Sequence, residues 1–192
     1  MSQDCGWPAD DPKMMRYHDT EWGVPLRDDS GLFEFLTLEA AQAGLSWRTV
    51  LYRREGYRRA FANFDIREIA GYDDTKIESL MRDAGIIRNR LKITATLINA
   101  RLVLAMQESG QSFEDYIWGL VGGVTQVNEF VDLSEIPATT LVSDQMSKRL
   151  KADGFKFVGS TTCYALMQAT GMVNDHLKAC SRYEPLVKMA RH

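Results

Sequence analysis

Residues 28–44, "DDSGLFEFLTLEAAQAG", carry the signals of one helix from its start to its end. The segment opens on Asp28, Asp29 and Ser30, whose side chains cap helix N-termini, and it closes on Gly44, which ends helices. Apolar side chains between these ends recur with the period of a helix, which predicts a stripe packed against a hydrophobic core. The stripe comprises Leu32, Phe35, Leu36 and Ala43.

Glu39 lies on the same stripe, seven residues after Leu32. A carboxylate at a core-facing position is costly unless it is paired, protonated or open to a cavity. Two interpretations remain: an ion pair with one of the arginines, or a pocket carboxylate that binds a polar or cationic ligand. Nearby aromatic residues favour the pocket, because indole rings and a carboxylate together suit a flat cationic heterocycle. These residues are Trp7, Tyr17, Trp22 and Trp47.

Helix signals continue through most of the chain. Ser46 and the pair Asp73–Asp74 precede helical segments, and Ser112 and Ser143 are further candidate caps. Two more apolar stripes follow. The first comprises Ile77, Leu80, Met81 and Ala84, and the second comprises Leu91, Ala95, Ile98, Leu102 and Ala105. Strand-like alternation is scarce, with residues 126–133, "QVNEFVDL", as its best example. The sequence therefore predicts an all-α fold of many short helices, with residues 122–138 as the longest loop.

Composition narrows the class of protein. The 192 residues fit a single domain, 1–192, and a net charge of −3 excludes a uniformly basic surface. A local basic patch can still bind nucleic acid. Residues 1–13 lack a secretory signal, and no apolar run approaches the roughly 18 residues of a membrane span. Three cysteines do not suggest a disulfide framework, so we expect a cytoplasmic protein.

Residues 172–180, "MVNDHLKAC", place His176 and Cys180 four residues apart, on one face if the segment is helical. Cys5 and His18 near the N-terminus supply two more ligands of the same kinds. Together the four make a Cys2His2 set, which is typical of a closed tetrahedral zinc site. The alternative is that each side chain packs separately, since the spacing of the two pairs does not require a shared site.

A closed site of four protein ligands has no open position for water, so its role is structural. It would tie the two ends of the chain together. Cys163 lies in an apolar helical run and is expected to pack as a small hydrophobic residue. We assign no role to His192.

Residues 80–93, "LMRDAGIIRNRLKI", contain a turn at Gly85 between two helical patterns. The backbone N–H groups at the start of the second helix can bind a phosphate, with Arg88, Arg90 and Lys92 close by. The alternative is a solvated helix surface. Two other segments are rich in basic residues, 53–59 ("RREGYRR") and 148–156 ("KRLKADGFK").

The chain resembles the 3-methyladenine DNA glycosylase I family, bacterial base-excision-repair enzymes of the helix-hairpin-helix superfamily. The matching motifs follow the family's order from residue 5 to residue 180. They are "CGW", "YHDTEWGVP", "LEAAQAGLSWRTVL", "DAGIIRNRLKI", "LSEIP", "GFKFVGSTTCY" and "GMVNDHLKAC". Because the motifs span nearly the whole chain, the resemblance is more specific than any one of them.

The resemblance implies the zinc site at Cys5, His18, His176 and Cys180, tying segments of about 1–25 and 160–185. It implies that Glu39, Tyr17 and Trp47 line the pocket for the excised base, supported by Trp22, with Glu39 as the catalytic residue. It implies that Gly44 and Leu45 enter the duplex where the base has left. The helix-hairpin-helix element would lie at about 74–106, with Gly85, Arg88, Arg90 and Lys92 on DNA.

The chain departs from related patterns at two places. Met14 stands where some relatives have tyrosine, which puts the pocket contacts there in doubt. Many helix-hairpin-helix glycosylases place an aspartate on the helix after the hairpin to stabilise the developing sugar cation. Residues 91–107 contain no aspartate, and Glu108 is the first acidic residue. The family itself is similar in this respect.

The implied reaction is hydrolysis of the bond between 3-methyladenine and its sugar in alkylated double-stranded DNA. The base is flipped into the pocket, and an ionised Glu39 recognises its positive charge. We expect a monomer that leaves an abasic site without strand cleavage, because no amine nucleophile is evident. Two alternatives are a zinc hydrolase that uses His18 and Glu21, and a protein that binds alkylated DNA without excising the base.

Overall fold

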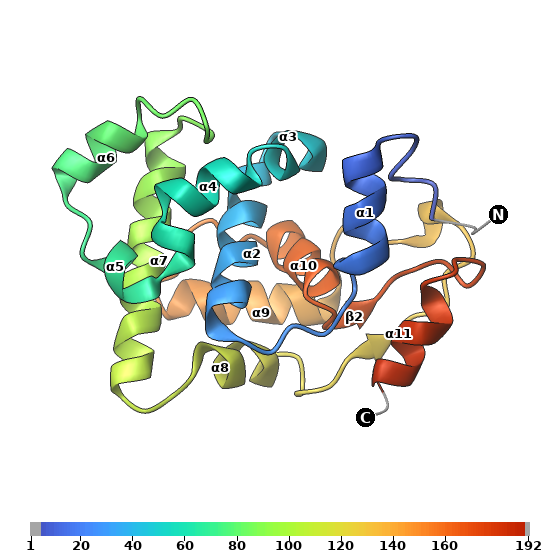
Figure 1. The fold of residues 1–192 in the computed structure, drawn as a ribbon. Coiled ribbons are helices and arrows are strands. Elements are labelled where there is room, and N and C mark those ends of the chain that lie inside the picture. The colour runs from blue at the N-terminus through green and yellow to red at the C-terminus, as the bar shows by residue number, and fades with distance from the viewer. Residues whose placement is uncertain (1–4, 191–192) are drawn as a thin grey trace.

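The computed structural model describes residues 5–190, which form short helices and one small sheet (Figure 1). His192 lies outside the described residues. The helices are α1 Pro12–Thr20, α2 Asp29–Gln42, α3 Trp47–Leu51, α4 Arg54–Ala60, α5 Ile66–Ala70, α6 Asp74–Leu80, α7 Arg90–Glu108, α8 Phe113–Gly119, α9 Leu141–Ala152, α10 Ser160–Ala169 and α11 Tyr183–Ala190. Short 3₁₀ turns occupy Ala62–Phe64 and Leu133–Glu135. The all-α prediction is confirmed, and none of the helices described has the length and apolarity to cross a bilayer.

Helix α2 lies at the centre of the fold and packs against α3, α7, α8 and α10 (Figure 1). Asp28 accepts a hydrogen bond from the Gly31 N–H and begins the helix as predicted. Every residue from 32 to 41 is buried, so the predicted stripe was too narrow. Ala43, predicted on the stripe, is exposed because α2 ends at Gln42 and Gly44 turns the chain with a φ of +79°.

Helix α7 corrects the second predicted stripe. Leu91 is 71% exposed and Ala105 is also exposed, whereas Ile93, Leu97 and Val103 are buried against the rest of the fold. Ala95 is buried and Ile98 and Leu102 are half-buried, so the predicted stripe is correct in its middle and wrong at its two ends. Because α7 is apolar on more than one face, periodicity alone did not fix which face would meet the core.

The cap predictions are mostly confirmed. Ser46 caps α3, Asp73 caps α6 and Ser112 caps α8. Ser143 is not an N-cap: α9 begins after Thr140, and the Ser143 side chain completes a capping box with that residue. Ala84 is exposed beyond the end of α6, since that helix stops at Leu80.

The sheet is shorter than the predicted strand, and the segment after it is not helical. β1 (Gln126–Val127) pairs in parallel with β2 (Val173–Asn174), so only two residues of the predicted strand 126–133 are extended in a sheet. Residues 175–180 form a turn rather than the expected helix. The Asn174 side chain accepts from the His176 N–H and donates to the Tyr183 carbonyl, which favours the turn over a helix.

Candidate functional site

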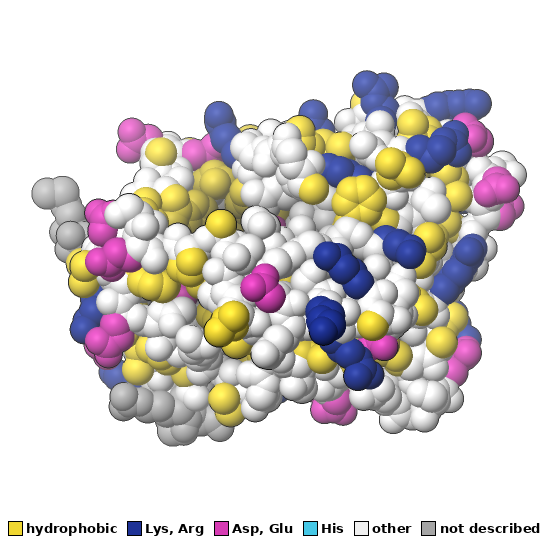
Figure 2. Space-filling model, turned by 180° about the vertical axis from the view of Figure 1, so that it is seen from behind, with side chains coloured by type: hydrophobic (Ala, Val, Ile, Leu, Met, Phe, Trp, Pro, Cys, Tyr) yellow, Lys and Arg dark blue, Asp and Glu magenta, His cyan; other side chains and the backbone are white. Residues whose placement is uncertain are grey.

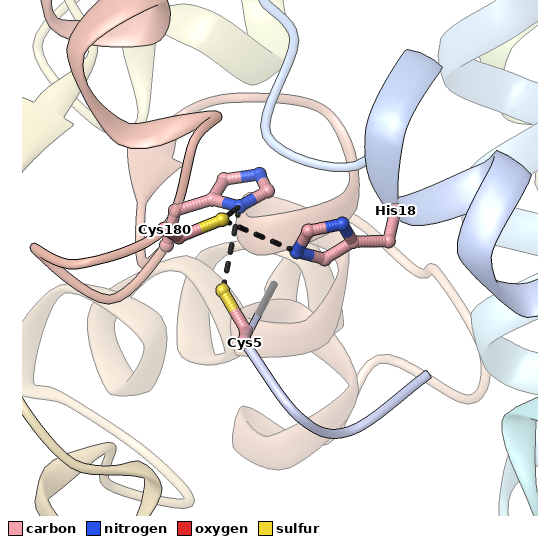
Figure 3. Close-up of side chains that lie close together, drawn as sticks. Cys5, His18 and Cys180 are labelled. Carbon is pink, nitrogen blue, oxygen red and sulfur yellow. Dashed lines mark hydrogen bonds between the residues drawn. The ribbon is translucent and has the colours of Figure 1, made fainter. Parts of the chain in front are cut away.

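The four predicted metal ligands meet at one buried point. Cys5 comes from the N-terminal segment, His18 from α1, and His176 and Cys180 from the turn after β2, as Figure 3 shows for its labelled members. Helices α1 and α11 lie at the same end of the molecule (Figure 1), so the two ends of the chain are brought together here. The predicted grouping is confirmed, although a turn rather than a helix supplies its C-terminal half.

The distances fit a tetrahedral ion. Cys180 Sγ lies 3.4 Å from His176 Nδ1 and 3.6 Å from His18 Nε2, and Cys5 Sγ lies 3.5 Å from His176 Nδ1. All four ligand atoms lie within 4.8 Å of one another. Zinc bound to sulfur and nitrogen at its usual distances gives a tetrahedron with edges of about 3.3–3.8 Å. The residues present therefore fit a metal ion of this coordination.

The surroundings hold these ligands in the form that a metal requires. The Nδ1 atom of His18 lies 2.8 Å from Asp19 Oδ1, and the Nε2 atom of His176 lies 2.9 Å from the Trp22 carbonyl. Such contacts fix which ring nitrogen is left for the metal. Hydrogen bonding from Cys5, and then from the two imidazoles, lowers the pKa of Cys180 far below its ordinary value. The cluster thus favours a thiolate at Cys180.

A cavity of about 350 Å³ opens beside this cluster. All of the aromatic residues singled out in the sequence line it together with Glu39. Tyr17 and Trp47 lie with their ring centroids 5.2 Å apart, and Trp7 meets Trp22 edge to face at 5.2 Å. The cavity is thus a slot walled by flat rings, a shape that suits a planar heterocycle.

Glu39 is 5% exposed, and no described residue forms an ion pair or hydrogen bond with it. The arginine interpretation does not apply: Arg54 and Arg58 contact Glu34 instead, one and a half turns earlier on α2. Burial raises the pKa of Glu39 to about 8. Burial thus disfavours the ionised form that the sequence interpretation expected at Glu39.

The same surroundings shift the pKa of Tyr17. Burial, and then the charge of Glu39, raises the pKa of its phenol well above the ordinary value. The indole N–H groups of Trp7 and Trp47 are buried without a hydrogen-bond acceptor among the described residues.

The sequence interpretation missed five residues of the lining. They are Gln42, Leu133, Ile136, Ala165 and Gln168. Gln42 lies almost one turn after Glu39 on α2, so helical spacing from Glu39 could have found it. The other four come from the loop after β1 and from α10, whose approach no local pattern predicts. Met14 is buried in the core and does not line the cavity, which removes the doubt about its contacts there.

Gly44 and Leu45 form a tight turn at the rim, between Glu39 and Trp47 in the chain. The Leu45 N–H donates to the Gln42 carbonyl at 2.6 Å, and the Leu45 side chain is 41% exposed. Lys92 holds the start of this turn: its ammonium donates to the carbonyls of Ala41 at 2.7 Å and Ala43 at 2.6 Å. Its charge is engaged within the protein, and partial burial lowers its pKa.

The other residues of the predicted hairpin are also partly engaged. The Gly85 N–H donates to Asp83 at 2.7 Å, and Gly85 packs against Gly56, where a side chain on Gly56 would meet the Gly85 carbonyl. Arg90 pairs with Glu78. Arg88 is exposed and makes no ion pair among the described residues. Among the predicted hairpin residues, Arg88 is thus the one with a charge that no described residue pairs.

The C-terminal part of α9 and the loop that leads to α10 have more basic charge to offer. Lys148, Lys151 and Lys156 are exposed and have no acidic partner in the described part of the chain. No side chain caps the N-terminus of α10, which begins after Gly159. Lys156 is held in place by reciprocal bonds between its backbone and the Asn99 side chain. Figure 2 shows Lys and Arg side chains gathered on one part of the face seen there.

Comparison with known proteins gives one consistent result. A family model described as methyladenine glycosylase matches residues 7–183. DNA-3-methyladenine glycosylase 1 of Escherichia coli K12 is 51% identical over 179 residues, which are 93% of this chain and 96% of that protein. A crystal structure of a 3-methyladenine DNA glycosylase I aligns with a TM-score of 0.91 at 49% identity, covering 93% of this chain and 98% of that one. The Staphylococcus aureus enzyme, in a structure on 3-methyladenine recognition, aligns with a TM-score of 0.90 at 34% identity, covering 94% and 96%.

Proposed function

This chain belongs to the methyladenine glycosylase family, and from that premise we propose how its cavity selects and excises a base. The protein is a base-excision-repair hydrolase that cleaves the N-glycosyl bond of 3-methyladenine in DNA. We propose that the flipped base enters the slot between Tyr17, Trp22 and Trp47. The observation that carries this proposal is the buried, unpaired carboxyl group of Glu39 at the bottom of an aromatic slot.

Charge is the basis of selection. At an effective dielectric constant of about 20, a carboxylate about 4 Å from a cationic base gains roughly 4 kcal/mol. Ionising Glu39 at pH 7 from a pKa of about 8 costs roughly 1.4 kcal/mol of that. About 2–3 kcal/mol remains before desolvation of the base, which is enough for a preference of tenfold or more over neutral adenine.

The cleavage step needs little help from the protein. The bond between the sugar C1′ and N9 breaks, and its electron pair neutralises the positive charge of the methylated base. Water then adds to C1′ and releases a proton, which leaves an abasic site. No lysine lines the cavity, so we propose that the enzyme forms no covalent intermediate and does not cut the strand.

The duplex meets the protein around the cavity mouth. We propose that Leu45, on its turn, fills the space of the flipped base. The lysines at the end of α9 and in the loop after it, together with Arg88, would contact the phosphates, because they are exposed and have no ion-pair partner in the described part of the chain. The α6–α7 turn predicted for this role has fewer free donors, since the Gly85 amide and Lys92 bond within the protein.

The metal site has a structural role in this proposal. Cys5, His18, His176 and Cys180 would hold one zinc ion, and four protein ligands leave no position for a catalytic water. This favours the glycosylase over the zinc hydrolase alternative, in which Glu21 would also be needed; Glu21 instead pairs with Arg54. Purified protein should contain one zinc per chain by metal analysis, and substoichiometric metal would contradict the assignment.

The proposal also extends to the working form of the protein. We propose a single catalytic domain that acts as a monomer on double-stranded DNA in the cytoplasm. The continuous core that joins α2, α7 and α10 supports the single domain.

One experiment tests the central proposal. Wild-type protein and Trp47→Ala are incubated with methylated DNA, and the released bases are separated by chromatography. Wild type should release 3-methyladenine without cutting the strand, and the variant should release it at least tenfold more slowly because a stacked base is worth about 1–3 kcal/mol. Binding without release would favour the non-catalytic alternative, and an unimpaired variant would place the base elsewhere.

A further inference from the structure

Asp175 is a buried carboxylate with an unusual set of partners. It is 1% exposed and lies next to the metal ligand His176 in the turn after β2. Its oxygens accept from Asn128 Nδ2 at 2.6 Å, Tyr164 Oη at 2.6 Å and Gln168 Nε2 at 2.8 Å. No arginine or lysine contacts it in the described part of the chain. Three neutral donors thus satisfy the buried charge.

These contacts fix the orientation of the Gln168 amide. The Gln168 Nε2 atom donates to Asp175 Oδ2, so the NH₂ side of the amide faces Asp175. Rotation of the amide by half a turn would bring two oxygens together and leave one acceptor bond unmade. Tyr164 and Gln168 are one turn apart on α10 and grip Asp175 from the same helix face. Gln168 therefore has a single orientation.

The fixed amide leaves its oxygen for the cavity. Gln168 lines the cavity with Glu39, whereas Asp175 is not part of the lining. The Gln168 Oε1 atom accepts no hydrogen bond from any described residue, although the Nε2 atom is engaged. It is also not among the buried polar atoms that lack a partner, so it retains access to the cavity or to solvent. The cavity lining thus includes the Gln168 amide oxygen as an acceptor besides the Glu39 carboxyl group.

We infer that Gln168 is a specificity-determining residue, and that Asp175 acts through it as a positioning residue. The Gln168 oxygen accepts a hydrogen bond from the exocyclic amino group of a 6-aminopurine. A 6-oxopurine carries an oxygen at that position, so two acceptors would face each other in a desolvated site, which disfavours 3-methylguanine. This inference rests on the proposed base pocket and adds discrimination between two methylated purines, which the charge of Glu39 does not provide.

The test compares equilibrium binding of free 3-methyladenine and free 3-methylguanine, followed by tryptophan fluorescence. Gln168→Met keeps the length of the side chain and removes the acceptor. It should bind 3-methyladenine about tenfold more weakly, with no fall in affinity for 3-methylguanine. The matched control is Gln145→Met, an exposed change on α9 that should leave both affinities as in wild type.

Asp175→Asn tests the positioning role. The asparagine amide can donate to the Gln168 oxygen, which allows the glutamine to turn its NH₂ group to the cavity. Affinity for 3-methylguanine should then rise relative to 3-methyladenine by tenfold or more. Metal content and melting temperature are measured alongside, because Asp175 neighbours a metal ligand. If this variant does not fold, Gln168→Met decides the inference by itself.

The outcomes separate the inference from the pocket proposal. Equal weakening of both bases by Gln168→Met, or no change, would overturn the role of Gln168. Trp47→Ala serves as the reference: if it loses base binding while Gln168→Met retains wild-type selectivity, the pocket stands and the inference fails. If neither change affects binding, the base lies elsewhere and the pocket proposal fails as well.

Discussion

Helix α2 buries two glutamates, Glu34 and Glu39, and their surroundings differ. Glu34 is contacted by the guanidinium groups of Arg54 and Arg58, at distances between 2.7 and 3.2 Å. Glu39, five residues later and equally buried, has no partner in the described structure and faces a cavity. The helix thus uses one glutamate in an ion-pair network within the fold and presents the other, which we propose to bind the base, to a cavity.

This difference shows which buried charges indicate function. A paired carboxylate is stabilised within the free protein, whereas an unpaired one destabilises the free protein until a ligand supplies the missing charge. Burial and residue type are the same at both sites. Only the partners distinguish them, and partners become visible only when the fold is known.

The largest expected effect comes from removing Glu34, the glutamate in the ion pairs. Glu34→Ala should lower the free energy of unfolding by about 3 kcal/mol, the low end for a broken buried ion pair, because Arg54, 7% exposed, loses its buried partner and keeps only the half-exposed Glu21. Denaturant unfolding measures this change. Glu55→Ala removes the exposed partner of Arg58 and should stay within about 0.5 kcal/mol of wild type. If the two variants are equally mild, Glu34 is not the structural carboxylate of the pair.

A change at Glu39, the glutamate that faces the cavity, should affect excision rather than stability. Glu39→Gln should reduce kcat/KM for excision of 3-methyladenine by about 30- to 100-fold, equivalent to the 2–3 kcal/mol of net charge recognition. Its free energy of unfolding should not fall, since no partner is lost. Single-turnover excision and denaturant unfolding test the two halves of this statement. Wild-type excision by the variant would remove Glu39 from the mechanism.

The sequence identified Glu39 as a cavity residue, but the pattern that drew attention to it is not the one the structure shows. Glu39 was singled out because it interrupted an apolar stripe, yet residues 32–41 are buried on every side, so no stripe exists there. Glu34 was not singled out, because one-sided burial would have placed it in solvent. The all-α fold and most helix caps depend on local chemistry, and the sequence predicted them.

Features that depend on tertiary packing were less accessible. The buried face of α7 was predicted only in part, because several faces of that helix are apolar. The turn at residues 175–180 replaced an expected helix because its bonds run to a strand and to α11. The four metal ligands and the cavity residues Tyr17, Trp22 and Trp47 were named from the sequence with the help of a family resemblance. Gln168 was missed, because its approach to Glu39 depends on how α10 packs against α2.

The raised pKa of Glu39 makes the stability of the protein depend on pH. The native pKa of Glu39 is raised to about 8 from an unfolded value near 4.5, so the native state binds more protons than the unfolded state between these values. Its stabilising contribution is full below pH 4.5 and is lost as pH rises through 8. Glu39→Gln removes this dependence. The stability advantage of the variant should therefore widen by at most about 1.4 kcal/mol per pH unit across the window. Denaturant unfolding at four pH values measures it, and parallel curves would contradict a protonated Glu39.

The smallest effect concerns Lys92, which bonds the last carbonyls of α2 beyond Glu39. Lys92→Met should slow excision by roughly three- to tenfold, because the turn carrying Leu45 loses its support. Lys151→Met, the same change at an exposed lysine proposed to contact phosphate, should instead weaken DNA binding and reduce its salt slope by about 1. Binding titrations over a range of salt concentrations separate the two roles. The Lys92 ammonium is already engaged by two carbonyls, so its loss should leave the salt slope unchanged. A reduced slope would mean that Lys92 leaves α2 to contact DNA. The turn after α2 would then be held by Lys92 only when no substrate is present.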